Sequence, residues 1–357
     1  MERGPCSGRS AADDTRKRLM QSLNIVFTGK HEVVARHEPV EQPGRGQLLV
    51  QARQSLISTG TECMCLARTF APGTPADRWV RYPFHPGYST AGRVLEVGPA
   101  VDTFAVGDRV ATRAPHSQYA LVDAERAVHV PPEVADDAAA WIGLAGIAQN
   151  AVRRARHRLG DRVLVVGLGL LGQLVVQYAR LSGAREILAL GRTRPRLDMA
   201  QRHGATHALM LDAAHAADAV RSLTDHQLAD VVYDATGDPA VLGAALPMVR
   251  RWGTLVLLSD AERPGEQRLT SDVVARGLHI LGAHDHDPPP VATEHTPWSH
   301  AAMAQLFFTY LQRGQMRVDD LITHRFAPHA APEAYTMLTD NRSESLGVVF
   351  DWTGLGD

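Results

Sequence analysis

An apolar run followed by three spaced glycines does most to limit the fold of this chain. The segment VLVVGLGLLGQLVV covers residues 163–176 and places Gly167, Gly169 and Gly172 in the pattern G-x-G-x-x-G. The apolar run is typical of a buried strand, and the apolar residues after the glycines have helical spacing. A strand, a tight glycine turn and a helix in this order predict a βαβ unit that binds a dinucleotide.

Strand and helix patterns alternate along the second half of the chain, which indicates a doubly wound parallel sheet. Strands are expected at 163–169, 186–191, 207–211, 229–237, 254–259 and 279–285, and helices at 134–156, 170–184, 196–205, 214–224 and 240–253. Before residue 134, short β-rich runs separated by Gly and Pro resemble a small, mostly antiparallel barrel or sandwich. We therefore predict an α/β protein with a Rossmann sheet and a second, mostly β domain.

The length of 357 residues predicts two domains, because single hydrophobic cores stop growing near about 250–300 residues. We expect a disordered extension at 1–20 and a mostly β domain at 21–144. The dinucleotide-binding domain is expected at 145–287. A helix at 300–314 and a strand at 346–352 place the segment 288–357 back in the mostly β domain.

Composition excludes some classes of partner. The formal net charge of −2 gives no sign of a nucleic-acid partner, because nucleic-acid-binding proteins carry basic patches. No stretch approaches the roughly 18 apolar residues of a membrane-spanning helix, and the N-terminus lacks the apolar core of a signal peptide. A cytoplasmic location without a membrane partner is expected. Cys6, Cys63 and Cys65 are too few for a disulfide framework and are interpreted as free thiols.

The glycine turn is the predicted cofactor site. Gly167 permits the tight turn, Gly169 lets the backbone approach a pyrophosphate, and Gly172 allows the helix to pack closely on the strand. Leu170 and Leu171 begin that helix, whose free N–H groups attract phosphate oxygens. A strand-to-helix turn without a ligand is the alternative interpretation.

The end of the second strand favours NADP(H). NAD-binding proteins place an acidic residue about 20 residues after the glycines, where it binds the ribose 2′-hydroxyl. Here Gly191 takes that place, and Arg192, Thr193 and Arg196 follow. Guanidinium groups bind a 2′-phosphate through charge-assisted hydrogen bonds. A solvated helix start is the alternative, and it suits Arg196 better than Arg192.

Two further strand ends are candidate cofactor contacts. The fourth strand ends in DATG, which contains Thr236 and Gly237, and the fifth ends at Ser259. Loops at the carboxyl ends of such strands face the cofactor. Ordinary strand-end turns are an equally good interpretation of these residues.

Three segments carry a resemblance to a known family: GYSTAGRVLEVGPAVDTFAVGDRV at 87–110, GLGLLG at 167–172 and RLDMAQRHGAT at 196–206. Together they resemble the medium-chain dehydrogenase/reductase superfamily. The resemblance implies a GroES-like, mostly β catalytic domain, an active site in the cleft between the domains, and a homodimer. The spellings ISTGTE and PGYSTAGRV further resemble a zinc-independent branch near bacteriochlorophyllide dehydrogenase, whose members interconvert a secondary alcohol and a ketone.

Zinc-dependent members of the family hold a catalytic metal with a Cys, a His and a further Cys or acidic residue. In this chain Thr59 stands in place of the Cys and Tyr88 in place of the His. The third position falls in WIGLAG at 141–146, which offers no ligand. Only Glu62 could bind, whereas a catalytic zinc needs three protein ligands. No metal is expected.

Without a metal, side-chain donors must stabilise the negative charge that hydride transfer produces on a carbonyl oxygen. Tyr88 can donate as a phenol, Thr59 can add a hydrogen bond, and Glu62 can act as a general acid or base. Thr61 matches the family's relay hydroxyl, but Met64 replaces the histidine that usually accompanies it. Packing in the space left by zinc remains the alternative for Tyr88, and a structural acceptor role remains the alternative for Glu62.

The resemblance and the residues together predict a zinc-independent, NADP(H)-dependent oxidoreductase. Its expected substrate is a secondary alcohol or ketone of a small sugar-like, cyclitol or secondary-metabolite compound. Two alternatives stay open: an NADPH-dependent quinone or enoyl reductase, and a catalytically inactive dinucleotide-binding protein. The loop at 284–300, rich in His, Asp and Pro, is interpreted as a lid between the domains.

Overall fold

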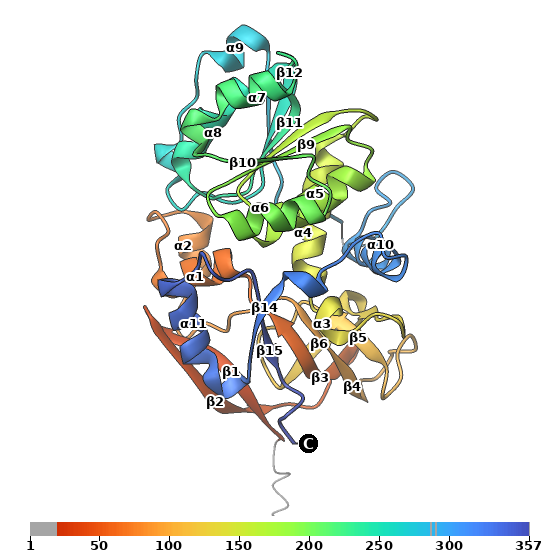
Figure 1. Cartoon of the computed structure of the whole chain (residues 1–357). Helices are drawn as coiled ribbons and strands as arrows, with labels where there is room; N and C mark the ends of the chain where they lie inside the picture. Colours follow the sequence, from red (N-terminus) through yellow and green to blue (C-terminus); the bar gives the residue numbers. More distant parts are fainter. Residues whose placement is uncertain (1–19, 286–287, 290, 357) are drawn as a thin grey trace, which may run out of the picture.

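A computed structural model describes residues 20–285, 288–289 and 291–356 (Figure 1). The expected extension at 1–20 lies outside the described residues except for Met20, which begins the first strand. A mostly β domain forms the lower half of Figure 1, and a parallel sheet flanked by helices forms the upper half. The predicted two-part α/β fold is therefore confirmed.

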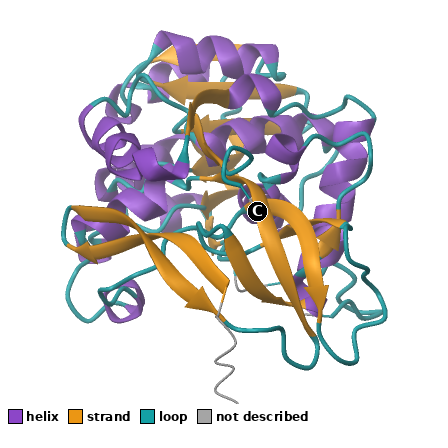
Figure 2. Ribbon diagram, turned by 90° about the horizontal axis from the view of Figure 1, so that it is seen from below, coloured by secondary structure: helices purple, strands orange, loops and turns teal. Residues whose placement is uncertain are grey.

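The mostly β domain contains a hairpin and a larger, mostly antiparallel sheet. Its strands are β1 (Met20–Gly29), β2 (Glu32–Val40), β3 (Gln47–Leu56), β4 (Thr90–Val97), β5 (Arg109–Thr112), β6 (Tyr119–Asp123), β7 (Val128–His129), β14 (Ile322–Phe326) and β15 (Gly347–Asp351). Strands β1 and β2 pair with each other, the larger sheet has the order β14-β15-β3-β4-β5-β7, and β6 pairs with β3. The C-terminal strand β15 pairs with β3, so the chain returns to its first domain as expected. Figure 2 shows these strands from below.

The upper domain is a six-stranded sheet in which every neighbouring pair is parallel. Its strands are β8 (Arg162–Val166), β9 (Glu186–Gly191), β10 (His207–Met210), β11 (Ala229–Asp234), β12 (Val249–Leu257) and β13 (His279–Gly282). The order β10-β9-β8-β11-β12-β13 is that of a dinucleotide-binding Rossmann sheet. The reversal of strand order beside β8 opens the crevice where such sheets bind ligands.

Helices cover both domains and connect them. The mostly β domain carries α1 (Thr59–Ala67), α2 (Pro75–Trp79), α3 (Asp136–Ala139) and α11 (Ala331–Asp340). The Rossmann sheet carries α5 (Leu170–Leu181), α6 (Arg194–Arg202), α7 (Ala217–Leu223), α8 (Pro239–Ala245) and α9 (Asp272–Arg276). Helices α4 (Ile142–Ala155) and α10 (His300–Gln312) lie between the domains. No helix in the described part of the chain is long and apolar enough to span a membrane.

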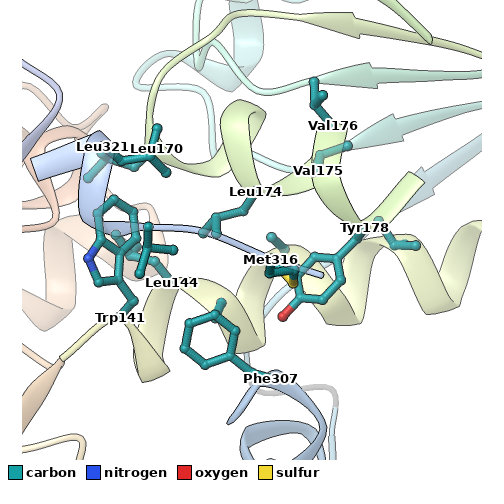
Figure 3. Packing of buried hydrophobic residues seen from close by; sticks show 14 of the residues in the cluster. Trp141, Leu144, Leu170, Leu174, Val175, Val176, Tyr178, Phe307, Met316 and Leu321 are labelled. Carbon is teal, nitrogen blue, oxygen red and sulfur yellow. The ribbon is translucent and has the colours of Figure 1, made fainter. Parts of the chain in front are cut away.

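A continuous apolar core joins the two halves. Trp141 and Leu144, at the start of α4, pack with Leu170 of α5, Phe307 of α10 and Leu321, as Figure 3 shows. Trp141 and Leu321 are fully buried. Burial of large apolar side chains is the main favourable term in such contacts, so this cluster fixes the mostly β domain against the glycine turn.

The structure corrects two predicted helices and adds one helix that the sequence does not predict. The helix predicted at 240–253 ends at Ala245, and β12 begins at Val249 because this part of the chain supplies a neighbour for β11. The helix predicted at 134–156 is divided into α3 and α4. Helix α1 was absent from the prediction, since its residues, TGTECMCLA, have little amphipathic pattern.

Candidate active site

The glycine turn between β8 and α5 has the shape that a pyrophosphate requires. Gly167 has a φ of +90°, which disfavours any side chain with a Cβ. A Cβ on Gly172 would lie 2.0 Å from the carbonyl oxygen of Gly167, whereas a Cβ on Gly169 would meet nothing within 4 Å. The side chains of Leu170 and Leu171 pack in the core, so these residues can offer only backbone N–H groups. The open space at Gly169, beside the free N–H groups of a helix N-terminus, fits an anionic ligand.

The end of β9 presents unpaired polar groups beside that turn. Arg192 is exposed, and no salt bridge of its guanidinium is found within the described residues. The hydroxyl of Thr193 is buried without a hydrogen-bond partner in the described part of the chain. Gly191 adds no side chain there. Unpartnered buried donors of this kind are uncommon, and they fit the oxygens of a ligand phosphate.

Arg196 is used differently from Arg192. Its Nη2 donates to the backbone oxygens of Arg342 and Ser345, the latter at 2.7 Å. Burial, together with the positive charge of Arg342, lowers the pKa of the Arg196 guanidinium. Arg196 therefore ties α6 to the C-terminal part of the mostly β domain, and its Nε is buried without a partner in the described structure.

The DATG segment lines the glycine turn. Thr236 places its Cγ2 2.7 Å from the position of a Cβ on Gly167. Its hydroxyl donates to Asp234 at 2.6 Å, and burial raises the pKa of the Asp234 carboxyl. Gly237 has a φ of +72° and lies beside half-buried Ser259. Thr236, Gly237 and Ser259 therefore lie at strand ends beside the glycine turn. The Thr236 hydroxyl already donates its hydrogen bond to Asp234.

Hydroxyl groups gather where zinc-dependent members carry their metal ligands. Tyr88 donates a hydrogen bond to Ser58 Oγ at 2.6 Å. Burial raises the pKa of the Tyr88 phenol to about 12, although hydrogen bonds with Ser58 and Thr61 lower it. Ser58 precedes α1 as its N-cap, and Thr59 is the first residue of that helix. The structure thus brings Thr61 and Tyr88 together and adds Ser58. Thr59 begins α1, and its role beside the phenol stays a prediction.

Ser58 is a site residue that the sequence does not single out. The only available signal is its position before an unpredicted helix, because serine is a preferred N-cap residue. Its side chain makes no capping hydrogen bond, and its Oγ receives the Tyr88 phenol instead. The residue therefore serves the phenol rather than the helix.

Glu62 lies at the centre of a buried hydrogen-bond network. Its side chain is 2% exposed and accepts from Ser58 N at 2.7 Å, from His116 Nε2 at 3.1 Å and from the hydroxyl of Tyr335. His116 Nδ1 faces Ser55 Oγ, which itself accepts from the indole of Trp352. Every donor in this hydrogen-bond network has an acceptor when the His116 ring carries its hydrogen on Nε2. The geometry favours an anchoring role for Glu62 and leaves its acid or base role a prediction.

The hydrogen-bond network around Glu62 is expected to stabilise the folded protein. Glu62→Gln places an amide NH₂ where the carboxylate accepts from several donors, so at least one buried donor loses its partner. We expect the free energy of unfolding to fall by about 2–4 kcal/mol, measured by urea denaturation. Exposed Glu344 provides the control, because Glu344→Gln should change the value by less than about 0.5 kcal/mol. Equal effects of the two substitutions would contradict the anchoring role.

An ion pair between the domains also borders the phenol. Arg113, after β5, pairs through Nη1 with Asp285, which follows β13. Arg113 Nη2 also donates to the carbonyl oxygen of Gly143 at 3.1 Å. The sequence shows Asp285 only as part of a His- and Asp-rich loop and gives no signal for Arg113, because pairing across domains depends on tertiary structure.

The donor set beside Tyr88 does not fit a catalytic zinc. Zinc prefers thiolate, imidazole or carboxylate ligands, and no three His, Cys, Asp or Glu side chains converge anywhere in the described residues. Burial raises the pKa of the Cys63 thiol to about 11 and that of the Cys65 thiol further. Both thiols are therefore protonated near neutral pH, which makes them poor metal ligands.

Two family models match this chain. The model described as "Alcohol dehydrogenase GroES-like domain" matches residues 44–159, and the model described as "Zinc-binding dehydrogenase" matches residues 171–288. The D-guloside 3-dehydrogenase of Escherichia coli K12 is 28% identical over 275 residues, which cover 75% of this chain and 78% of that protein. The L-threonine 3-dehydrogenase of Paraburkholderia phymatum is 25% identical over 349 residues, covering 86% and 96%.

Solved structures share the fold. A Sinorhizobium meliloti protein classed as a zinc-binding dehydrogenase and solved with NADP has a TM-score of 0.79 at 21% identity, covering 93% of this chain and 99% of that one. Galactitol-1-phosphate dehydrogenase of Escherichia coli has a TM-score of 0.76 at 18% identity, covering 93% and 100%. With the two matched domains and the Rossmann strand order, these likenesses identify the chain as a member of the medium-chain dehydrogenase/reductase superfamily, a family of nicotinamide-dependent oxidoreductases.

Proposed function

We propose that the protein is a zinc-independent, NADP(H)-dependent oxidoreductase that interconverts a secondary alcohol and a ketone in a small polar substrate. The observation that carries the proposal is the hydrogen bond from Tyr88 to Ser58 at 2.6 Å. It holds a phenol at the sequence position that the family resemblance assigns to a metal ligand in zinc-dependent members. The names of two relatives, a guloside 3-dehydrogenase and a threonine 3-dehydrogenase, support dehydrogenation of an alcohol.

A nicotinamide cofactor held at the glycine turn would supply the hydride that reduces the carbonyl carbon. On ketone binding, the Tyr88 hydroxyl turns from Ser58 to the carbonyl oxygen, donates a hydrogen bond to it and gives it a proton as the alcohol forms. With a pKa of about 12, the phenol is protonated near neutral pH and ready to donate. Ser58 and Thr61 hold the phenol and stabilise the phenolate that results, as donors aimed at developing charge do.

A small cavity offers the phenolate a source of protons. It measures about 120 Å³, and its lining includes Thr61, Glu62, His85 and Tyr88. A space of this size accommodates a few water molecules, each with a share of about 30 Å³ in the liquid, and the polar side chains in its lining can bond them. Water in the cavity returns a proton to Tyr88 after each turnover.

We propose the same division of the chain that the sequence predicts, with a catalytic domain at 21–144 and 288–357 and a cofactor domain at 145–287. The protein is also proposed to form a homodimer. Edge strand β13 exposes Ile280, and Val274 and Trp252 are exposed nearby on α9 and β12. Exposed apolar groups beside a free strand edge favour pairing with a second copy.

Cofactor selectivity tests the role of Arg192. Arg192→Ala removes a guanidinium that is placed to bind a 2′-phosphate, so the Kd for NADPH should rise by about 10- to 100-fold while the Kd for NADH stays constant. Fluorescence titration with both cofactors measures the two constants. Arg194→Ala is the matched control, because Arg194 is exposed and paired with Asp198 at 2.8 Å. An equal loss for both cofactors, or tighter binding of NADH by the unmodified protein, would overturn the NADP(H) assignment.

Turnover tests the proposal as a whole. Purified protein is incubated with NADPH and a panel of hydroxylated and plain ketones, and loss of NADPH absorbance is followed. The proposal predicts ketone-dependent oxidation of NADPH and formation of the alcohol. NADPH binding without turnover of any ketone would contradict it.

A further inference from the structure

The interdomain pair of Arg113 and Asp285 lies close to the proposed proton donor. Arg113 Nη2 donates to the carbonyl oxygen of Gly143 at 3.1 Å. A Cβ on Gly143 would lie 2.7 Å from the backbone oxygen of Tyr88, so α4 begins directly against the segment that carries the phenol. The negative charge of Asp285 also acts on Tyr88, where it adds to the effect of burial on the phenol pKa. The ion pair is therefore held to the start of α4, next to the segment that carries the phenol.

The pair has capacity left to bind a ligand. Both side chains are 23% exposed, so neither is sealed in the core. Arg113 Nη1 donates to Asp285 Oδ2. Within the described residues, Oδ1 of Asp285 and Nε of Arg113 have no hydrogen-bond partner. One free acceptor and one free donor thus lie side by side at the junction of the domains.

A guanidinium already paired with a carboxylate selects for neutral ligands. The two charges nearly cancel, so an incoming phosphate or carboxylate meets repulsion from Asp285 as well as attraction to Arg113. A hydroxyl group avoids this conflict, because its O–H can donate to the carboxylate while its oxygen accepts from the guanidinium. The chemistry of the pair matches an alcohol hydroxyl.

We propose that Arg113 and Asp285 bind a hydroxyl group adjacent to the reacting carbon, which makes the preferred substrate an uncharged polyhydroxylated ketone or alcohol. This inference rests on the proposed function and narrows it to one substrate class. Phosphorylated polyols and amino-acid substrates are disfavoured by Asp285.

A pair of ketones that differ by one hydroxyl tests the inference. 2-Hydroxycyclohexanone carries the adjacent hydroxyl, and cyclohexanone lacks it. Hydrogen bonds to charged groups discriminate by about 10- to 150-fold, so kcat/KM should favour the hydroxylated ketone by that factor. Asp285→Ala should reduce the ratio of the two kcat/KM values to near one. The ratio is the readout, because loss of the Asp285 charge also acts on the pKa of Tyr88 and so changes the rates with both ketones together.

Asp285→Ala should also change the preference for uncharged over anionic ketones. The substitution leaves Arg113 without its counter-ion, so kcat/KM for the anionic ketone 4-oxopentanoate should rise relative to cyclohexanone. Loss of a purely structural contact would not produce this gain. Asp137→Asn is the matched control, because Asp137 pairs with Arg325 at 2.6 Å elsewhere in the chain; it should leave all three ketones unchanged.

Binding provides a readout that does not require turnover. Calorimetric titration of cofactor-saturated protein should give a lower Kd for cis-cyclohexane-1,2-diol than for cyclohexanol, and Asp285→Ala should remove the difference. Equal Kd values for the two alcohols in the unmodified protein would overturn the inference. Tighter diol binding without oxidation of the diol would instead uphold the recognition role and contradict the proposed function.

Discussion

Tyr88→Phe is expected to lower kcat for ketone reduction by about 10²- to 10⁴-fold, the range of a lost general acid. The substitution removes only the hydroxyl that bonds Ser58, and the ring continues to pack against the core. Binding of NADPH and the free energy of unfolding should therefore change little. Steady-state kinetics with 2-hydroxycyclohexanone and urea denaturation measure both properties.

The pH dependence of alcohol oxidation gives this prediction a second signature. Oxidation needs the phenolate as a base, and the pKa of Tyr88 is raised to about 12 by burial. Below that value the phenolate fraction increases about tenfold for each pH unit, so kcat/KM for oxidation should rise with pH toward 12. In the reduction direction the phenol is the active form, and its loss would begin only as pH approaches the pKa.

Tyr88→Phe should remove this rise with pH. Ser58→Ala is the companion variant, because it keeps the phenol and removes a hydroxyl whose hydrogen bond lowers the phenol pKa; it should raise the pKa further and lower the oxidation rate more modestly. Full activity in Tyr88→Phe would show that another group delivers the proton, and Glu62 would be the next candidate because its carboxylate lines the same cavity.

Two glycine substitutions should separate the folding role of the turn from its binding role. In Gly172→Ala the new Cβ would lie 2.0 Å from the oxygen of Gly167, so backbone must shift and the free protein should lose several kcal/mol, about 2–5 by analogy with overpacked sites. In Gly169→Ala the Cβ meets nothing within 4 Å, so the free protein should keep its stability. That Cβ would occupy the space proposed for the pyrophosphate.

The cofactor responses of the two variants should therefore differ. Gly169→Ala should unfold at the same temperature as the unmodified protein without cofactor, but NADPH should no longer raise its Tm appreciably. Gly172→Ala should unfold earlier under both conditions. Thermal unfolding with and without NADPH measures both. A normal NADPH shift in Gly169→Ala would place the cofactor elsewhere and contradict the assignment of the turn.

The parts of the fold that could be predicted depend on local pattern. The glycine turn at 167–172 and the alternation around it are local, and the predicted Rossmann sheet and mostly β domain are confirmed. The helix predicted at 240–253 is wrong beyond Ala245, since β11 requires a parallel neighbour that no local pattern reveals. Helix α1 was missed for the opposite reason, because its short sequence lacks an amphipathic stripe.

In the candidate site, too, local sequence motifs could be predicted and contacts between distant segments could not. Residues replaced within a recognisable motif, such as Thr59 and Tyr88, could be predicted because the position is defined by its neighbours in sequence. Contacts between distant segments could not, and Arg113 with Asp285, 172 positions apart, is the clearest example. The network around Glu62 is a third case, because the sequence shows the carboxylate but not the donors from His116 and Tyr335 that surround it.

The central claim is that Tyr88 and its neighbouring hydroxyls replace a catalytic metal. One measurement tests it most directly: NADPH-dependent reduction of 2-hydroxycyclohexanone by protein that has been dialysed against a strong chelator, with zinc in the same sample determined by mass spectrometry. We predict full activity with far less than one zinc per chain. Activity that disappears on chelation and returns in proportion to added zinc would contradict the claim.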